Sequence, residues 1–170
     1  MMAECRPYEL RCELLENPIG LGETCPRLSW KLDDGRVGAV QTAYQVAAAS
    51  SKAALLTTPD LWESGRIKSG QSLDIEYSGK KLTSRSGVWW RVRVWDLHEK
   101  PSAWSEPAYF EIGLLKKSDW QAQWIHRPVN NKEAGQPCPY LRKQFTLPSA
   151  VTSARLYVTA QGLFEAYCNG

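Results

Sequence analysis

The segment 89–96, Trp-Trp-Arg-Val-Arg-Val-Trp-Asp, places the strongest constraint on the fold. Alternate residues from Trp90 to Val94 are apolar, and Arg91 and Arg93 fall between them. In an extended chain, alternate side chains point to opposite faces, so one face here is apolar and the other is charged. The segment therefore predicts a β-strand with one buried face.

Further segments up to residue 112 show the same strand pattern, and each is bounded by Gly, Pro, Asn, Asp or Ser. The predicted strands are 27–32, 42–48, 72–77 and 104–112. One short helix is expected at 51–57, with Ser50 or Ser51 as its cap. About seven short strands with turns between them predict an antiparallel β-sandwich of the immunoglobulin or fibronectin type III kind.

The pattern changes after Gly113, so we divide the chain into residues 1–113 as the sandwich, 114–121 as a linker, and 122–170 as the start of a second β domain. The strands expected in the second domain are 122–126, 140–145, 154–161 and 163–168. The final Asn169-Gly170 is a strong hairpin signal, yet no returning strand follows it. We therefore expect the second domain to be incomplete, and its open edge to favour self-association.

Composition excludes several classes of protein. Apolar residues make up 43% and charged residues 23% of the 170 residues, which is globular rather than disordered. The net charge of +3 comes from basic residues spread along the chain, which argues against nucleic acid as a partner. No apolar run is long enough to span a membrane. The eight tryptophans suit either sandwich cores or sugar-stacking surfaces.

The cysteines and the amino terminus leave the compartment open. Five cysteines cannot all pair, and none has the spacing of a metal site, so most are expected to be free thiols, with one disulfide among the first three allowed. The first residues show no secretory signal. A cytoplasmic location is expected unless a signal has been removed, in which case the protein would be periplasmic or extracellular.

The chain resembles the amino-terminal region of bacterial α-L-rhamnosidases of glycoside hydrolase family 78. The order and spacing of the matching segments over nearly the whole chain make this resemblance strong. The segments are NPIG (17–20), PRLSW (26–30), QTAYQV (41–46), LWESG (61–65), WRVRVWD (90–96), SAWSE (102–106), FEIGLL (110–115), DWQAQWI (119–125), LRKQF (141–145), ARLY (154–157) and NG (169–170).

The resemblance implies a fold and a role. In that family a fibronectin-like domain precedes a jelly-roll domain similar to carbohydrate-binding modules, and a separate α/α barrel cleaves terminal α-L-rhamnose by inversion. It therefore implies the first strands of a truncated jelly-roll sandwich after residue 121, and no barrel within these residues. Trp30 resembles the core tryptophan of the fibronectin fold, and Trp90 stands where its corner tyrosine usually sits.

No local constellation predicts catalysis, a metal ion or a cofactor. An inverting glycosidase needs two carboxyl groups roughly 6.5–9.5 Å apart. The candidate pairs are Asp33 with Asp34, Asp74 with Glu76, and Asp96 with Glu99, and turns or solvated strand faces explain each of them. His98 and His126 lack neighbours at metal spacing. We expect no catalytic residue here.

The outward row Trp89, Arg91, Arg93 and Trp95 is the most suggestive surface. Indole and guanidinium planes stack on each other and can also grip a sugar, but a packed ladder or a contact with a neighbouring domain is the favoured interpretation. Trp120 and Trp124, near the junction, are interpreted in the same way as contacts between domains. Trp30, Trp62 and Trp104 are interpreted as core residues.

Three functions compete. The leading hypothesis is a non-catalytic accessory region of an α-L-rhamnosidase, whose partners are the other domains of the parent enzyme. A free carbohydrate-binding module would instead bind rhamnose-containing glycans through exposed tryptophans. A fibronectin-type adhesion module would bind proteins, but it gives no reason for the rhamnosidase-like segments after Gly113.

Overall fold

The computed structural model describes residues 5–126, 138–147 and 149–169. The chain divides into two compact units, Met1–Ala122 and Gln123–Gly170. Among the described residues, no helix is long and apolar enough to cross a membrane.

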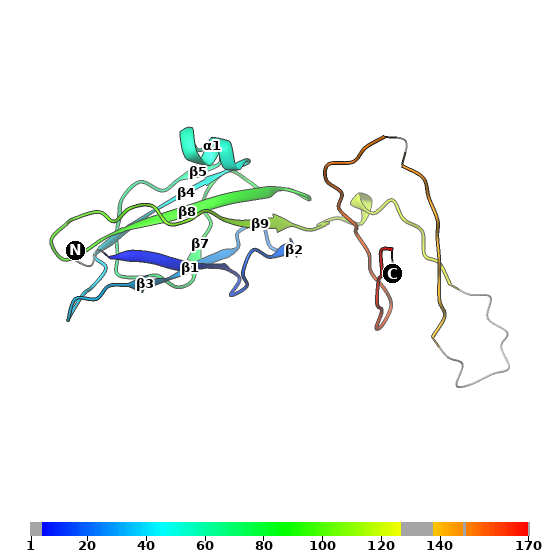
Figure 1. The fold of residues 1–170 in the computed structure, drawn as a ribbon, viewed down its shortest axis with the longest axis horizontal. Helices are drawn as coiled ribbons and strands as arrows, with labels where there is room; N and C mark the ends of the chain where they lie inside the picture. Colours follow the sequence, from blue (N-terminus) through cyan, green and yellow to red (C-terminus); the bar gives the residue numbers. More distant parts are fainter. Residues whose placement is uncertain (1–4, 127–137, 148, 170) are drawn as a thin grey trace. The chain divides into compact units, whose positions relative to one another are not determined.

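The first unit is a two-layered sandwich whose strands pair antiparallel, except that β2 pairs with β9 in parallel (Figure 1). One layer contains three strands in the order β1-β3-β7, and the other contains six, in the order β2-β9-β8-β4-β5 with β6 paired to β4. The strands are β1 (Arg6–Cys12), β2 (Ile19–Leu21), β3 (Arg27–Asp33), β4 (Ala43–Ala49), β5 (Trp62–Glu63), β6 (Ile67–Lys68), β7 (Ile75–Glu76), β8 (Gly87–Trp95) and β9 (Ala108–Ile112). This arrangement confirms the predicted β-sandwich.

The long pair β4 and β8 forms the centre of the larger sheet. The two strands are antiparallel, with a register that runs from Ala43 opposite Trp95 to Ala49 opposite Trp89. All seven residues of β4 are buried, so both faces of this strand are covered. A strand that is covered on both faces is expected to be a nearly continuous run of apolar residues, and residues 43–49 have such a composition.

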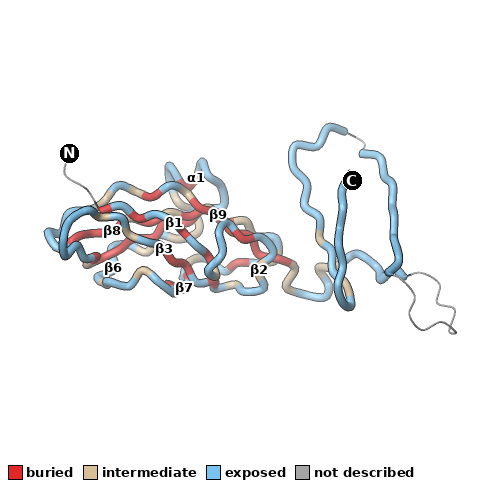
Figure 2. The backbone as a smooth tube through the Cα atoms, turned by 60° about the horizontal axis from the view of Figure 1, so that its bottom comes forward, coloured by how far each residue is buried: buried red, intermediate tan, exposed pale blue. Residues whose placement is uncertain are grey.

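The core lies between the two sheets (Figure 2). The residues predicted to point inward from β8 are fully buried, and Trp30 is also in the core. The Trp30 indole donates a 3.1 Å hydrogen bond to the side-chain oxygen of Gln41. The Gln41 amide nitrogen in turn donates to the carbonyl oxygens of Ser69 and Gln71. The indole nitrogen of Trp90 has no hydrogen-bond partner among the described residues, so Trp90 makes no equivalent of a tyrosine-corner bond.

The predicted helix forms as α1 (Lys52–Thr57), and Ser51 is its cap. The Ser51 hydroxyl accepts a 3.1 Å hydrogen bond from the backbone nitrogen of Ala54. Leu55 is buried against Ala47 and Ala49 on the outer face of β4. The helix therefore covers part of the face of the large sheet that points away from the core.

Two predicted strands are shorter in the structure. The segment 72–77 has only the two residues of β7 in strand conformation, and Asp74 before them has a positive φ of 56°. The segment 104–112 becomes a strand only at Ala108, because the chain before it pairs with β8 only in part through its backbone. The backbone nitrogens of Ser102 and Ser105 donate to the carbonyls of Val94 and Val92, each at 2.8 Å. The hydroxyls of Ser102 and Ser105 accept hydrogen bonds from the backbone of Val94 and Val92, and Pro107 has no N–H to donate.

Residues predicted as a linker include a short 3-10 helix, η1 (Lys117–Asp119), that is attached to the sandwich. The Asp119 carboxylate accepts a hydrogen bond from the Ser84 hydroxyl, and the Arg85 guanidinium donates to the Asp119 carbonyl at 3.1 Å. Leu115 packs against the core. This segment therefore belongs physically to the first unit.

The four strands predicted after residue 121 do not form in the described part of the second unit, so that local prediction is wrong. A strand exists only when a neighbour supplies hydrogen bonds to its backbone. No backbone pairing of this kind is present among the described residues of 123–169. The apolar side chains of Phe145, Leu156 and Phe164 are exposed. Asn169 has the positive φ, 63°, that a hairpin turn requires, and Gly170 lies outside the described residues.

Candidate functional site

The row of residues predicted to point outward from β8 lies on the outer face of the large sheet. Trp89, Arg91 and Arg93 are half-buried, and Trp95 is only 7% exposed. Trp104, from the loop that precedes β9, completes the cluster. The sequence analysis interpreted Trp104 as a core residue and did not predict its place in this cluster. The neighbouring serines, which bond to β8, are the sequence signal that could have placed Trp104 beside that strand.

We call the set of Trp89, Arg91, Arg93, Trp95 and Trp104 the aromatic–cation ladder. Its members stack on one another. The guanidinium carbon of Arg91 lies 4.6 Å from the Trp104 ring centroid, and that of Arg93 lies 4.8 Å from the same centroid. Arg93 is also 5.1 Å from the centroid of Trp95. These distances are typical of cation–π contacts. Further contacts at the two ends join Lys52 to Trp89, Arg66 to Trp95, and Trp89 to Tyr109.

The two arginines of the ladder differ in their hydrogen bonding. Arg93 donates from its Nε to the side-chain oxygen of Gln45 at 2.9 Å, and Gln45 donates to Glu63 at 3.2 Å. The Nε of Arg91 is buried without a partner among the described residues. The pKa of Arg91 is lowered mainly by burial and, to a smaller extent, by the positive charge of Arg93.

Stacking within the domain occupies much of the aromatic surface of the ladder. Trp104 and Trp95 each contact two guanidinium groups. These contacts describe a packed ladder, and a contact of this row with a sugar or with a neighbouring domain stays a prediction. The two other tryptophans predicted as contact residues belong to different units: Trp120 is half-buried in the first, and Trp124 is 65% exposed in the second. A contact role for either one stays a prediction.

Four of the six candidate carboxylates fall into two groups, and a fifth, Glu99, pairs with Arg66 at 3.2 Å. Asp34 and Asp96, 62 positions apart in the chain, are joined by Arg36, whose nitrogens lie 2.6 and 2.8 Å from their oxygens. These hydrogen bonds to Arg36 lower the pKa of Asp34 to about 2 and also lower that of Asp96. Both groups are ionised at neutral pH, so neither suits the role of a general acid. Sequence reasoning did not find this clamp, because the residues meet only in the folded chain.

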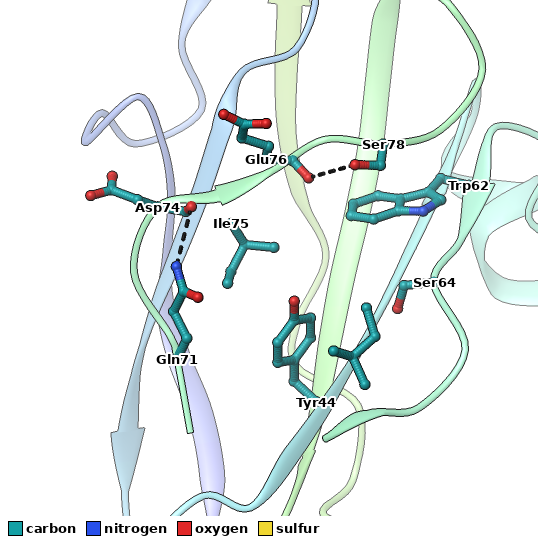
Figure 3. Close-up of a pocket in the computed structure, with 9 residues that line it drawn as sticks. Tyr44, Trp62, Ser64, Gln71, Asp74, Ile75, Glu76 and Ser78 are labelled. Carbon is teal, nitrogen blue, oxygen red and sulfur yellow. Dashed lines mark hydrogen bonds between the residues drawn. The ribbon is translucent and has the colours of Figure 1, made fainter. Parts of the chain in front are cut away.

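Asp74 and Glu76 lie beside a pocket of about 500 Å³ at the open side of the sandwich (Figure 3). The pocket lies between β7 of the small sheet and strands β4, β5 and β6 of the large one. Its lining residues are Tyr44, Trp62, Ser64, Ile67, Gln71, Asp74, Ile75, Glu76 and Ser78. Sequence patterns offer no marker for this pocket, because its wall combines residues of β4, β5, β6 and β7 with residues of the loops around them.

The described part of the chain contains no candidate metal site. No group of three or more His, Cys, Asp or Glu side chains there is placed to hold a metal ion. His98 and His126 are both exposed. All five cysteines are free thiols, with Cys5 and Cys12 buried and the other three exposed.

Comparison with known proteins identifies the first unit. Residues 7–116 match the family described as "Rha78A-like, N-terminal immunoglobulin domain". The chain belongs to this family. An α-L-rhamnosidase from Alteromonas sp. (strain LOR) is 44% identical over 161 residues, which covers 91% of this chain and 18% of the relative. An α-L-rhamnosidase from Streptomyces avermitilis is 35% identical over 189 residues, covering 99% of this chain and 18% of the relative.

Solved structures of α-L-rhamnosidases share the fold of this Rha78A-like immunoglobulin domain. The Streptomyces avermitilis enzyme complexed with L-rhamnose matches with a TM-score of 0.71 and 41% identity, covering 74% of this chain and 12% of that one. The enzyme from Dictyoglumus thermophilum matches with a TM-score of 0.69 and 35% identity, covering 72% and 14%. The chain therefore spans less than a fifth of the length of the curated relatives and solved structures named here.

Proposed function

We propose that this chain is the amino-terminal, non-catalytic accessory region of an α-L-rhamnosidase, a glycoside hydrolase that acts on terminal α-L-rhamnose by inversion. Its role is to pack against and position the other domains of the parent enzyme. The observation that carries the proposal is the match to rhamnosidases along at least nine tenths of this chain but only 18% of theirs.

The geometry of the carboxylates supports a non-catalytic role. Asp34 and Asp96 are engaged by Arg36, and Glu13 is engaged by Arg27 at 2.6 Å. An inverting mechanism needs one carboxyl group whose pKa is raised enough to hold a proton. The shifts resolved for carboxyl groups of the described residues are all downward.

We extend the proposal to residues 122–170 as the incomplete start of a second β-sandwich domain. Two features support this. Residues 154–161 alternate apolar and polar side chains, and Leu156 and Val158 on the apolar face are exposed. Apolar side chains in this pattern are stable when further strands cover them. The partners that would do so are other parts of the parent enzyme.

A chimera tests the accessory role. The matching region of the Alteromonas rhamnosidase is deleted in one variant and replaced by this chain in a second. We expect deletion to lower the melting temperature and the yield of soluble enzyme, and replacement to restore both together with hydrolysis of p-nitrophenyl α-L-rhamnoside. A deletion variant as stable and active as the intact enzyme would overturn the role.

A direct assay tests the non-catalytic claim. The purified chain is incubated with p-nitrophenyl α-L-rhamnoside, beside the intact Alteromonas enzyme as a positive control. No hydrolysis is expected from the chain. Hydrolysis that survives repurification, and that disappears when one of its own carboxylates is replaced, would show that the chain has an active site.

A further inference from the structure

We propose that the pocket between β7 and strands β4, β5 and β6 binds one neutral sugar ring, which stacks on Trp62 and hydrogen bonds to Tyr44 and Gln71. The inference goes beyond the accessory role and does not depend on it. The pocket volume of about 500 Å³ lies within the range of roughly 300–1,000 Å³ that is usual for small-molecule sites.

The aromatic wall of the pocket is held in place from behind. The Trp62 ring makes an edge contact with Tyr77, with centroids 5.3 Å apart. Gly79 lies so close that a Cβ atom there would be 2.5 Å from the Cβ of Trp62. The Tyr77 hydroxyl also donates to the carbonyl of Lys80 at 3.0 Å, which fixes this turn. A preorganised ring lowers the entropy lost on binding.

Two polar groups of the wall have unused hydrogen-bonding capacity. The Tyr44 hydroxyl points between Ile75 and Trp62 (Figure 3) and makes no hydrogen bond with another described residue, although the side chain is only 7% exposed. Burial raises the pKa of Tyr44, so the hydroxyl is protonated and can donate. The Gln71 amide nitrogen donates to the carbonyl of Leu73 at 2.8 Å, which leaves the amide oxygen as an acceptor.

The charges around the pocket favour a neutral ligand with hydroxyl groups. Asp74 and Glu76 are exposed at the rim, and their carboxylates point away from the middle of the pocket (Figure 3). Carboxylates repel anions and accept hydrogen bonds from hydroxyl groups. An aromatic face with a few polar groups around it matches the alternating apolar and hydroxylated surfaces of a sugar ring.

Titration followed by NMR tests the pocket. The ¹⁵N-labelled chain is titrated with L-rhamnose and D-glucose up to about 50 mM, since a small exposed site is expected to bind in the millimolar range. We expect saturable shifts of the Trp62 indole signal. Tyr44→Phe should weaken binding by up to about tenfold through the loss of one hydrogen bond, and Trp62→Ala should abolish it.

The controls separate the pocket from other causes. Tyr44→Phe removes one oxygen that bonds to no described residue, so the fold should persist even if Trp62→Ala unfolds the chain. Tyr8→Phe changes a tyrosine of β1 at a second cavity of about 300 Å³ and should leave binding unchanged. The proposal fails if neither sugar binds, if binding is insensitive to Tyr44→Phe, or if only the cation choline, titrated in parallel, shifts the signal. None of these outcomes alters the expectation for the chimera.

Discussion

At the scale of single residues, Arg36 joins two loops at one end of the sandwich. Its guanidinium contacts Asp34 and Asp96, and the Asp96 carboxylate also accepts hydrogen bonds from the backbone nitrogens of His98 and Lys100. Asp96 itself is buried, so its charge needs these partners. Hydrogen bonds between charged groups are stronger than neutral ones, so Arg36 is expected to order both loops.

This clamp predicts a dependence of stability on pH. The Arg36 contact lowers the pKa of Asp34 from 3.8 to about 2. A depressed pKa in the folded state stabilises the protein above the unfolded pKa, and the stabilisation is lost as the pH falls through the folded value. Arg36→Gln should therefore unfold at lower urea concentration than the parent at neutral pH, and the gap should shrink between pH 3.8 and about 2. A gap that stays constant in urea titrations across this range would contradict the prediction.

Burial of the thiols predicts two classes of cysteine reactivity. Burial raises the pKa of Cys12 to about 12 and that of Cys5 to about 11, whereas Cys25, Cys138 and Cys168 are exposed. The thiolate is the reactive form. A chromogenic disulfide reagent should therefore modify three thiols quickly and the remaining two only after denaturation. Rapid reaction of all five under native conditions, with the count checked by mass spectrometry, would exclude this packing.

At the scale of elements, the ladder on β8 links the central strands to the loop before β9. Trp104 stacks with two arginines of β8, while Ser102 and Ser105 pair with the backbone of the same strand. The helix α1 covers the neighbouring part of this face through Leu55. The outer face of the large sheet is thus covered by the domain's own residues along much of β4 and β8.

The two arginines of the ladder are expected to contribute unequally to stability. Arg93→Met loses the hydrogen bond to Gln45 and two ring contacts, and should lower the unfolding free energy by about 1 kcal/mol or more. Arg91→Met loses one ring contact but removes an unpartnered buried nitrogen and a repulsion with Arg93. Its stability should stay within about 0.5 kcal/mol of the parent. Equal losses in chemical denaturation would refute this difference.

At the scale of the whole molecule, the two units differ in how their apolar residues are covered. The first has a continuous core between two sheets. The described residues of the second expose Leu141, Phe145, Leu156 and Tyr167. Segments with few buried contacts and no backbone pairing open at low free energy. The two units should therefore differ in their resistance to proteolysis.

Limited digestion with trypsin checks this difference. Cleavage after Arg142 and Lys143, both exposed residues of the second unit, should precede any cleavage after Arg91 or Arg93 in β8. The expected product is a resistant fragment that retains residues 6–112. Mass spectrometry of a time course identifies the sites, and early cuts within β8 would contradict the assignment of the stable unit.

Exposed apolar residues of the second unit also predict self-association. Apolar surface of this kind and unpaired backbone favour contacts between copies. Light scattering should give a mass that rises with concentration for the whole chain, while the resistant tryptic fragment should remain a monomer. A constant monomer mass for the whole chain would refute the prediction.

The sequence by itself determined the sandwich, the position of α1 and the inward face of β8, because these depend on local periodicity and on turn and capping residues. It narrowed the cap of α1 to Ser50 or Ser51, and the structure selects Ser51. Only the tertiary structure decided the Arg36 clamp and the pocket, because each joins residues that are distant in the chain. It also decided that 154–161 forms no strand, although the alternation there is as regular as in β8. The alternation of apolar and polar side chains predicts which face of a strand would be buried, but a strand forms only where a neighbouring strand pairs with its backbone.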